Sequence, residues 1–415
     1  MKPRRWPKRF WKSGLKMTID DLKKKIKKLG LTIDGDSGRM LVEWQKVPFS
    51  EADRPYWAGL SSIDGVGPNT LPLLISCFGS AKNVLFADKE LLTQAGIPVN
   101  VSARIVGFYG KSDIKKWFVR ALNPEPNINL SFLTPKDKVF PERLLTMAGA
   151  PSHLWAWGDK KILNQKRIVA VVGTRKITPY GRSVTEILAE GLAVRGVTVV
   201  SGLMYGVDEA AQRTVLKNNG IVIGVWAGGV TGQSLGSRFR LAREIVLNKG
   251  VVVSEFSSDK FPFKGTFPSR NRIVSGLAAG VVITEAAVKS GSLITADCAL
   301  DQGKPVGAVP GPITSPLSEG PNELLKNGAT PITNIIDILN MCGFSGEVLG
   351  KSLQYLPKNS KEKLILKLLA DQNLTVDDLV RNSSFPISEV SETLTSLELS
   401  GAVGQVGEEW RATVL

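Results

Sequence analysis

Residue types that build metal sites, disulfide frameworks and imidazole catalysts are scarce in this sequence. Cys77, Cys298 and Cys342 are its only cysteines and stand far apart among 415 residues. They are too few for a disulfide framework or a zinc site, which indicates a reducing compartment. His153 is the only histidine, so mechanisms that need two imidazoles are excluded, and we expect a packing role for it. No apolar run approaches the roughly 20 residues that cross a bilayer. We therefore expect a cytoplasmic protein without metal, cofactor or membrane contact.

Positive charge is abundant and is concentrated at one end of the chain. The 53 Lys and Arg residues exceed the 38 Asp and Glu residues by 15, which favours a polyanionic partner. Residues 1–46 alone hold 14 basic and 5 acidic side chains, a net +9. We interpret residues 1–48 as a basic tail with a short helix opening near Thr18. The tail either attracts phosphates nonspecifically or solubilises the protein. Translation from Met17 in place of Met1 would shorten it.

Residues 49–125 have the pattern of a small helical domain. Apolar-periodic stretches flank Gly65-Val66-Gly67-Pro68, and a second helix pair follows around Gly96-Ile97-Pro98. This arrangement predicts a helix-hairpin-helix (SAM-like) fold. The glycines of such a hairpin let backbone N–H groups approach a DNA phosphate, but they serve a tight turn equally well.

Residues 126–340 change to a repeating pattern of strand, glycine-containing loop and helix. The apolar β-branched runs end near Val172, Val200, Val225, Val253, Ile283 and Ala308. This spacing predicts an α/β fold with a mostly parallel, Rossmann-like sheet covered by helices on both faces. Ligands of such sheets bind at the carboxyl ends of the strands.

The end of the chain predicts a winged helix-turn-helix. Residues 341–355 form a linker, and residues 356–415 contain helices over 361–370, 376–382 and 387–400, then a two-stranded wing turning at Gly407. This segment carries six basic and nine acidic residues, a net −3. Its would-be recognition helix holds Glu389, Glu392 and Glu398 and no cation. We therefore expect a partner or regulatory module and not a DNA reader.

Two glycine-containing loops after predicted strands could hold an anion or support chemistry. Gly173-Thr174-Arg175 precedes Thr178, a predicted N-cap, and Pro179, a predicted first helical residue, so the loop resembles a phosphate cradle. It lacks both the dinucleotide and the Walker glycine patterns. Ser201-Gly202 follows the next strand. Asp208 lies at the start of the following helix. We interpret it as a carboxylate that caps backbone N–H groups, in preference to an acid-base residue.

The stretch from Lys260 to Arg272 interleaves aromatic rings with cations. It contains Phe261, Phe263, Phe267, Lys260, Lys264, Arg270 and Arg272. Stacking surfaces and phosphate contacts together are what a single strand with exposed bases requires. The alternative is a loop that its Phe side chains pin to the core. On a helix Arg270 and Arg272 lie about 200° apart, so we expect one to meet phosphate and the other to pair with protein.

A further neutral anion site is predicted where a helix begins after the strand that ends in Thr284-Glu285. Ser290, Gly291, Ser292 and Thr295 would offer hydroxyls and N–H groups there. Together with Gly173-Thr174-Arg175 they would line one rim of the sheet.

These motifs in this order resemble the DNA-processing protein A (DprA, also called Smf) family. The resemblance covers roughly residues 50–335 and includes Phe140-Pro141-Glu142-Arg143-Leu144, Trp157-Gly158-Asp159, Val172-Gly173-Thr174-Arg175, Ser201-Gly202-Leu203, Gly206-Val207-Asp208, Phe267-Pro268-Ser269-Arg270-Asn271-Arg272 and Ser290-Gly291-Ser292-Leu293-Ile294-Thr295. It implies a Rossmann-like core that binds single-stranded DNA without cutting it. It also implies a homodimer that loads a RecA-type recombinase in natural transformation, with no enzymatic activity.

On both grounds we assign a DNA-binding site. Its residues are Gly173, Thr174, Arg175, Ser201, Gly202, Lys260, Phe263, Lys264, Arg270, Asn271, Arg272, Ser290, Gly291, Ser292 and Thr295. Two departures from the family pattern fall beside this site. Ala211-Gln212 replaces Ala-His, and Gly232 to Arg238 replaces a Tyr-Pro motif. Arg238 or Arg240 would then supply charge at the edge of the pocket.

Two other classes of protein are alternatives. One is a nucleotide N-glycoside hydrolase of the lysine-decarboxylase-like group, with Asp208, Glu255 and Glu285 as acid and base. The sequence lacks the Pro-Gly-Gly-x-Gly-Thr-x-x-Glu run that marks that group. The other is a transcription regulator built on the winged helix, which the acidic recognition helix disfavours.

Overall fold

The computed structural model describes residues 31–33, 40–42, 44–108, 113–258, 260–344, 357, 359–369, 372–400, 402–406 and 409–412. The helix expected near Thr18 lies outside these residues. Within the expected tail, β1 (Leu31–Ile33) and β2 (Met40–Val42) pair antiparallel, which the sequence did not predict. The 3₁₀ turn η1 (Trp44–Lys46) follows. Trp44 and Val47 are buried in the core of the helices that come next.

The helical domain consists of short helices joined by tight turns, as the sequence predicts. Its elements are η2 (Glu51–Asp53), α2 (Arg54–Ser61), α3 (Thr70–Phe78), α4 (Ala81–Phe86), α5 (Lys89–Gln94), α6 (Val99–Val106) and α7 (Ile114–Leu122). The first hairpin joins α2 and α3 through Gly65, whose φ of 96° needs a glycine. The second joins α5 and α6 through Gly96, with a φ of 84°.

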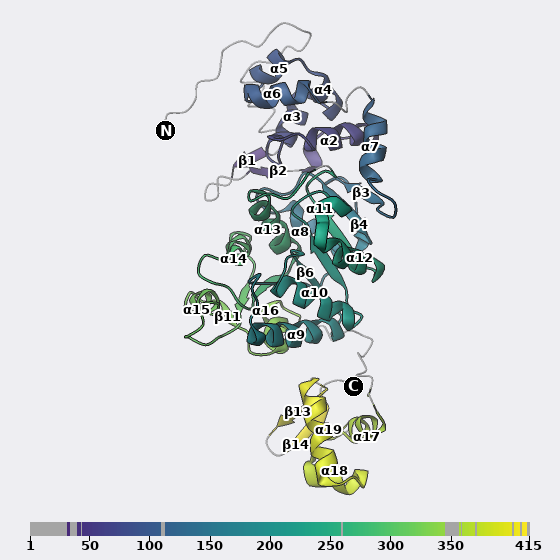
Figure 1. Cartoon of the computed structure of the whole chain (residues 1–415), viewed down its shortest axis with the longest axis vertical. Helices are drawn as coiled ribbons and strands as arrows, with labels where there is room; N and C mark the ends of the chain where they lie inside the picture. The colour runs from purple at the N-terminus through teal and green to yellow at the C-terminus, as the bar shows by residue number, and fades with distance from the viewer. Residues whose placement is uncertain are drawn as a thin grey trace.

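A nine-stranded sheet forms the centre of the molecule (Figure 1). Its strands are β3 (Leu130–Leu133), β4 (Leu154–Gly158), β5 (Ile168–Val172), β6 (Thr198–Ser201), β7 (Val222–Val225), β8 (Val251–Ser254), β9 (Gly280–Ile283), β10 (Val306–Ala308) and β11 (Thr330–Pro331). Their order is β11-β10-β9-β5-β6-β7-β8-β4-β3. Strands β5 to β11 run parallel, whereas β3 and β4 add an antiparallel edge. The sequence predicted the parallel strands β5 to β10 and missed β3, β4 and the short β11.

Helices cover both faces of the sheet because its two halves wind in opposite directions from β5. The helices are α8 (Glu142–Leu145), α9 (Pro179–Val194), α10 (Val207–Lys217), α11 (Gly232–Leu235), α12 (Phe239–Leu247), α13 (Thr266–Leu277), α14 (Gly291–Asp301), α15 (Glu319–Lys326) and α16 (Ile335–Met341), with 3₁₀ turns η4 (Lys160–Asn164) and η5 (Gly236–Arg238). Right-handed crossovers place α9, α10 and α12 on one face, and α13 and α14 on the other.

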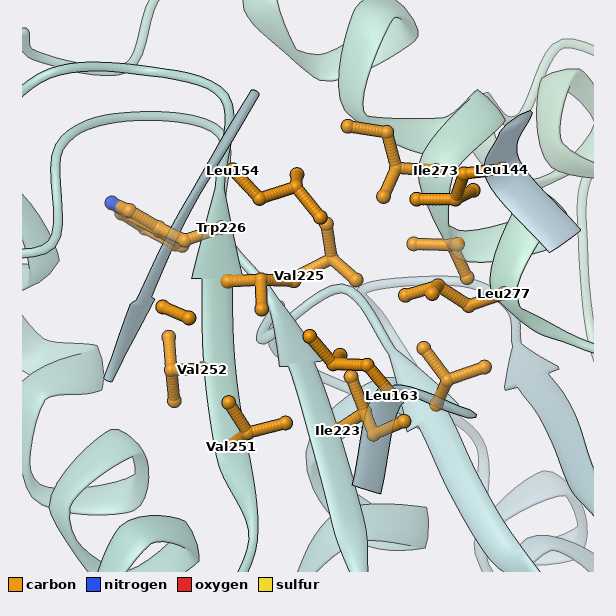
Figure 2. Packing of buried hydrophobic residues seen from close by; sticks show 14 of the residues in the cluster. Leu144, Leu154, Leu163, Ile223, Val225, Trp226, Val251, Val252, Ile273 and Leu277 are labelled. Atoms are coloured by element: carbon orange, nitrogen blue, oxygen red, sulfur yellow. The ribbon is translucent and has the colours of Figure 1, made fainter. Parts of the chain in front are cut away.

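The core under α8 and α13 is built from branched apolar side chains. Figure 2 shows Leu144 of α8 beside Ile273 of α13, with Leu277 turned toward the strands and Val225 and Val251 facing that layer from β7 and β8. Burying each such side chain contributes about 1.5–3 kcal/mol. The same core continues into the helical domain, because Trp57 is fully buried and donates from Nε1 to the Ser152 carbonyl at 3.2 Å. The helical domain and the sheet therefore share one hydrophobic interior.

The C-terminal part is the predicted winged helix, with a hydrophobic core of its own. It consists of α17 (Ser360–Leu368), β12 (Leu374–Thr375), α18 (Val376–Ser383), α19 (Ile387–Leu399), β13 (Val403–Val406) and β14 (Glu409–Ala412). Its three strands form one antiparallel sheet in the order β12-β14-β13. No helix in the described part of the chain is long and apolar enough to cross a membrane.

Candidate nucleic-acid interface

The loop after β5 packs too tightly for any residue but glycine at its start. A Cβ at Gly173 would stand 2.6 Å from Cγ2 of Val207 and 2.8 Å from the Glu285 carbonyl oxygen. Thr174 donates its N–H to that carbonyl at 2.7 Å and accepts the N–H of Val207 at 3.1 Å. These bonds fix the loop, and Arg175 leaves it toward solvent as an exposed side chain. Its Cζ lies 5.0 Å from the centre of the Phe267 ring.

The N-terminus of α9 is already occupied by a carboxylate of the protein. Thr178 is the N-cap and Pro179 the first helical residue, as predicted. Glu285, 1% exposed, accepts the Thr178 N–H at 3.0 Å and the Thr178 hydroxyl at 2.5 Å. A Cβ at Gly181 would collide with this carboxylate at 2.1 Å. The expectation that the helix dipole here receives an external anion is therefore wrong, because Glu285 takes that position.

Arg270 of α13 lies buried under the carboxyl ends of β6 and β7. It is 4% exposed, and its Nη1 donates to the Val225 carbonyl at 3.1 Å. Its Nε has no hydrogen-bond partner among the described residues. Burial lowers the pKa of Arg270 to about 10, with the charge of Arg175 adding to that effect and Asp208 opposing it. The guanidinium stays protonated at neutral pH, so a positive charge sits just beneath this edge.

Asp208 fastens the loop that covers Arg270. Its Oδ2 accepts the N–H groups of Gly202 at 2.9 Å and Met204 at 3.4 Å. The expected capping role is thus directed to the preceding loop and not to the helix in which Asp208 lies. Burial raises the pKa of Asp208, whereas Arg270 and these hydrogen bonds work against the rise. Ser201 is equally committed, because its hydroxyl donates to the Val171 carbonyl at 2.8 Å.

Arg272 points away from Arg270 and pairs with protein, as predicted for one of the two. It forms an ion pair with Glu255, both side chains being almost fully buried. His153 adjoins this pair, and its Nε2 donates to the Glu255 carbonyl at 2.7 Å. Because a carbonyl only accepts, the neutral ring leaves Nδ1 to accept from the Ser152 hydroxyl at 3.1 Å. Burial lowers the pKa of His153 to about 4. The predicted packing role of His153 is confirmed.

The aromatic loop before α13 contacts the helical domain. Phe261 and Phe263 expose 52% and 54% of their surfaces, so these rings do not pin the loop to the core. Lys260 forms an ion pair with Asp64 in the first hairpin and lies 5.3 Å from the centre of the Phe263 ring. Lys264 is exposed beside them. Lys260 therefore has a protein partner that the sequence did not reveal.

The loop before α14 has the predicted geometry of a helix start. Ser290 is the N-cap, and its hydroxyl lies 2.8 Å from that of Ser292. Asn271 of α13 donates from Nδ2 to the Gly291 carbonyl at 3.0 Å, which joins this loop to the helix that carries Arg270. Thr295 is buried, at 2% exposure, so it lies beneath the surface of the loop.

The two expected edge cations are engaged within the protein. Arg238 donates to Glu209 at 2.7 Å and lies over the Tyr205 ring, whereas Arg240 pairs with Glu244 at 3.2 Å. Gln212, which stands at the other departure from the family pattern, is fully buried in α10. It therefore does not line the surface.

The recognition helix of the winged helix keeps the acidic character that the sequence indicates. One of its carboxylates, Glu389, pairs with Lys361 of α17 at 2.8 Å, so a neighbouring helix supplies the cation that α19 itself lacks.

In the described part of the chain, no cluster of three or more His, Cys, Asp or Glu residues could hold a metal ion.

Fold and edge together define a Rossmann-like protein with an arginine- and aromatic-lined rim, flanked by a helical domain and a winged helix. Residues 131–343 match the model of the DNA recombination-mediator protein A family, and residues 354–408 match that of the DprA winged helix domain. The chain therefore belongs to the DprA/Smf family.

Individual relatives and solved structures are similar to this chain over different parts of its length. The protein Smf of Escherichia coli is 34% identical over 364 residues, which cover 85% of this chain and 94% of that protein. The crystal structure of DNA processing protein A from Streptococcus pneumoniae shares 26% identity at a TM-score of 0.56, over 71% of this chain and 98% of that one. A structure of DNA processing protein A from Helicobacter pylori, concerned with its single-stranded DNA binding mode, is 35% identical at a TM-score of 0.45, over 51% and 94%.

Proposed function

We propose that this protein binds single-stranded DNA along the carboxyl edge of its sheet, as a step in DNA processing. The observation that carries the proposal is the pairing of charge and rings at that edge. The buried guanidinium of Arg270 lies beneath it, and the exposed guanidinium of Arg175 stands above it on Phe267. Phosphates need such cations, and unpaired bases need open aromatic faces.

Phosphate contact falls mainly to side chains, since several backbone N–H groups of the edge loops are used within the protein. Arg175 and Lys264 are exposed and can reach a strand, whereas Arg270 acts through its buried charge. Phe263 and Phe261 offer the stacking surfaces. The hydroxyls of Ser290 and Ser292, with the Gly291 N–H, complete the proposed site at the start of α14. Gly173, Thr174, Ser201, Gly202, Asn271, Arg272 and Thr295 shape these loops from below.

Binding without cleavage or base removal is supported by how the carboxylates are used. Asp208 accepts two loop N–H groups, Glu255 pairs with Arg272, and Glu285 binds the N-cap of α9. Each acid that a nucleotide N-glycoside hydrolase would need thus holds the structure together. A general base must instead reach a substrate proton.

We further propose that the bound strand is handed to a RecA-type recombinase, and that the protein acts as a homodimer. The family description as a recombination mediator supports the first part. The acidic α19 supports a protein-facing role for the winged helix, because three carboxylates on one helix disfavour contact with a phosphate backbone.

The test is a fluorescence-anisotropy titration of a labelled oligonucleotide across a salt series. Arg175→Ala should weaken single-strand binding by about 1 to 3 kcal/mol, while duplex of the same sequence binds more weakly to the wild type. Lys217→Ala is the matched control, because Lys217 ends α10 at the opposite edge of the sheet. Equal affinity of Arg175→Ala and wild type would refute the site. Release of free base from nucleoside monophosphates, measured in parallel, would instead favour the hydrolase.

A further inference from the structure

Tyr205 is a large aromatic side chain that is left half exposed beside the proposed DNA-binding site. It lies in the loop between β6 and α10, at the carboxyl edge of the sheet, and is 48% exposed. Neither composition nor spacing marked this residue as functional. Apolar rings are normally left this exposed when a partner covers them or when isolation makes the cost small.

The ring is held in place from one side and at its tip. Cζ of Arg238 lies 3.6 Å from the ring centre, which places the guanidinium directly against one face. Arg238 is in turn fixed by Glu209 at 2.7 Å. The Tyr205 hydroxyl lies 2.6 Å from that of Ser237. With one face on Arg238 and the hydroxyl on Ser237, the exposed area of Tyr205 belongs to the rest of the ring.

The loop that carries Tyr205 spans the distance between the two arginines of the proposed site. At its start, Gly202 lies against the Arg270 guanidinium, where a Cβ would stand 1.5 Å from Nη1. At its end, a Cβ at Gly206 would stand 2.8 Å from Cα of Arg175. Tyr205 is the neighbour of Gly206 in sequence. A strand that touches Arg175 therefore passes beside this ring.

We propose that Tyr205, backed by Arg238, is a stacking subsite for one base of the bound strand. A guanidinium under one face polarises the ring and prevents it from turning, so little side-chain freedom is lost when a base covers the other face. The subsite would accept any base, because every base has a flat aromatic face. Arg238 is a positioning residue here, since Tyr205 and Glu209 occupy it. The inference rests on the proposed single-strand binding and adds a contact to it.

The experiment compares oligonucleotides that carry bases with abasic strands of equal length and charge. For a thymine strand, Tyr205→Ala and Tyr205→Leu should each weaken binding about 5- to 100-fold. Tyr205→Phe should stay within about twofold of wild type, because it keeps the ring. For the abasic strand, all four proteins should bind alike. The slope of log affinity against log salt should not change, since no phosphate contact is removed. Phe86→Ala is the matched control, an exposed ring on α4 of the helical domain.

Other outcomes would separate this inference from the function on which it rests. A wild type that does not bind single strands would overturn the proposed function itself. Wild-type binding with unchanged affinity in Tyr205→Ala and Tyr205→Leu would overturn only the subsite. An equal loss for thymine and abasic strands would also overturn it, because the ring would then act through Arg238 on the backbone. Tyr205→Leu keeps Arg238 covered, so it tests stacking even where the alanine variant unfolds.

Discussion

Gly202 and Arg270 fit against each other so closely that neither tolerates a larger neighbour. A Cβ at Gly202 would stand 1.5 Å from Nη1 and 2.4 Å from Cζ of Arg270. The residues belong to different strand-helix units, 68 positions apart, and meet because β6 ends over α13. The buried charge of the edge therefore depends on the absence of a single methyl group.

Gly202→Ala should weaken single-strand binding by displacing Arg270. The Cβ forces the guanidinium away from the Val225 carbonyl, or forces the 202–206 loop outward. We expect about the same loss of affinity as for Arg270→Gln, in the range of 1 to 3 kcal/mol for a charged contact. The double variant should lose little more than either single one, since both remove the same feature. Additive losses in anisotropy titrations of the three proteins would show that the two residues act independently.

Removing the basic tail should change the salt dependence of binding and leave the site intact. The truncation should remove residues 1–43 and keep Trp44. The Trp44 side chain is only 3% exposed, and its ring centre lies 6.5 Å from that of Trp57. Log affinity should fall less steeply with log salt, by about 0.7 for each lost phosphate contact with a single strand. Saturation at low salt should be retained. If the slope is the same with and without residues 1–43, the tail does not touch DNA.

Removing the winged helix should leave single-strand affinity within about twofold, because its acidic helix offers no attraction to phosphate. The cut belongs after Phe344, which is 8% exposed and has Arg167 5.3 Å from its ring centre. A cut before Phe344 would remove this side chain and expose the interior of the sheet domain that it covers. Oligomeric state and partner contacts are the properties that this truncation should change. A tenfold loss of affinity, or tight duplex binding by the isolated 356–415 fragment, would contradict the charge argument.

His153 should make the protein less stable as the solution is acidified. Its pKa is about 4 in the fold and 6.5 when exposed, so between these values the unfolded chain binds more protons. Stability therefore rises with pH through this window and is lost as pH falls through it, by about 2 kcal/mol at pH 5. Urea unfolding at pH 7.5 and pH 5 should show a smaller difference for His153→Gln than for wild type. Equal differences would mean that His153 is protonated in the fold.

The sequence predicted those parts of the structure that local rules determine. Thr178 before Pro179 and Ser290 before Gly291 both mark helix starts, because a capping hydroxyl acts within three residues. The buried strands β5 to β10 were found through their β-branched runs. Strands β3 and β4 were missed, since only pairing with distant β8 makes Trp155 and its neighbours an edge of the sheet.

Long-range contacts account for what the sequence could not reveal at the site. Lys260 pairs with Asp64, which is 196 residues away, and no local pattern joins them. Glu285 reaches Thr178 across 107 residues. Tyr205 gains its support from Arg238 only when η5 folds beside the 202–206 loop. In each case the residue type was visible, but its partner depends on the topology of the sheet.

The carboxylate of Glu285 at the start of α9 also affects whether the protein binds a free nucleotide or only a polymer of nucleotides. Many Rossmann-like proteins hold a lone nucleotide by presenting a helix end to its phosphates. Glu285 occupies that position at α9, so a free nucleotide would meet only separate side chains and the loop before α14, each weak alone. A polymer can engage many of them at once, and its affinity grows with every added unit. The protein should therefore ignore the pool of free nucleotides around it and respond to length.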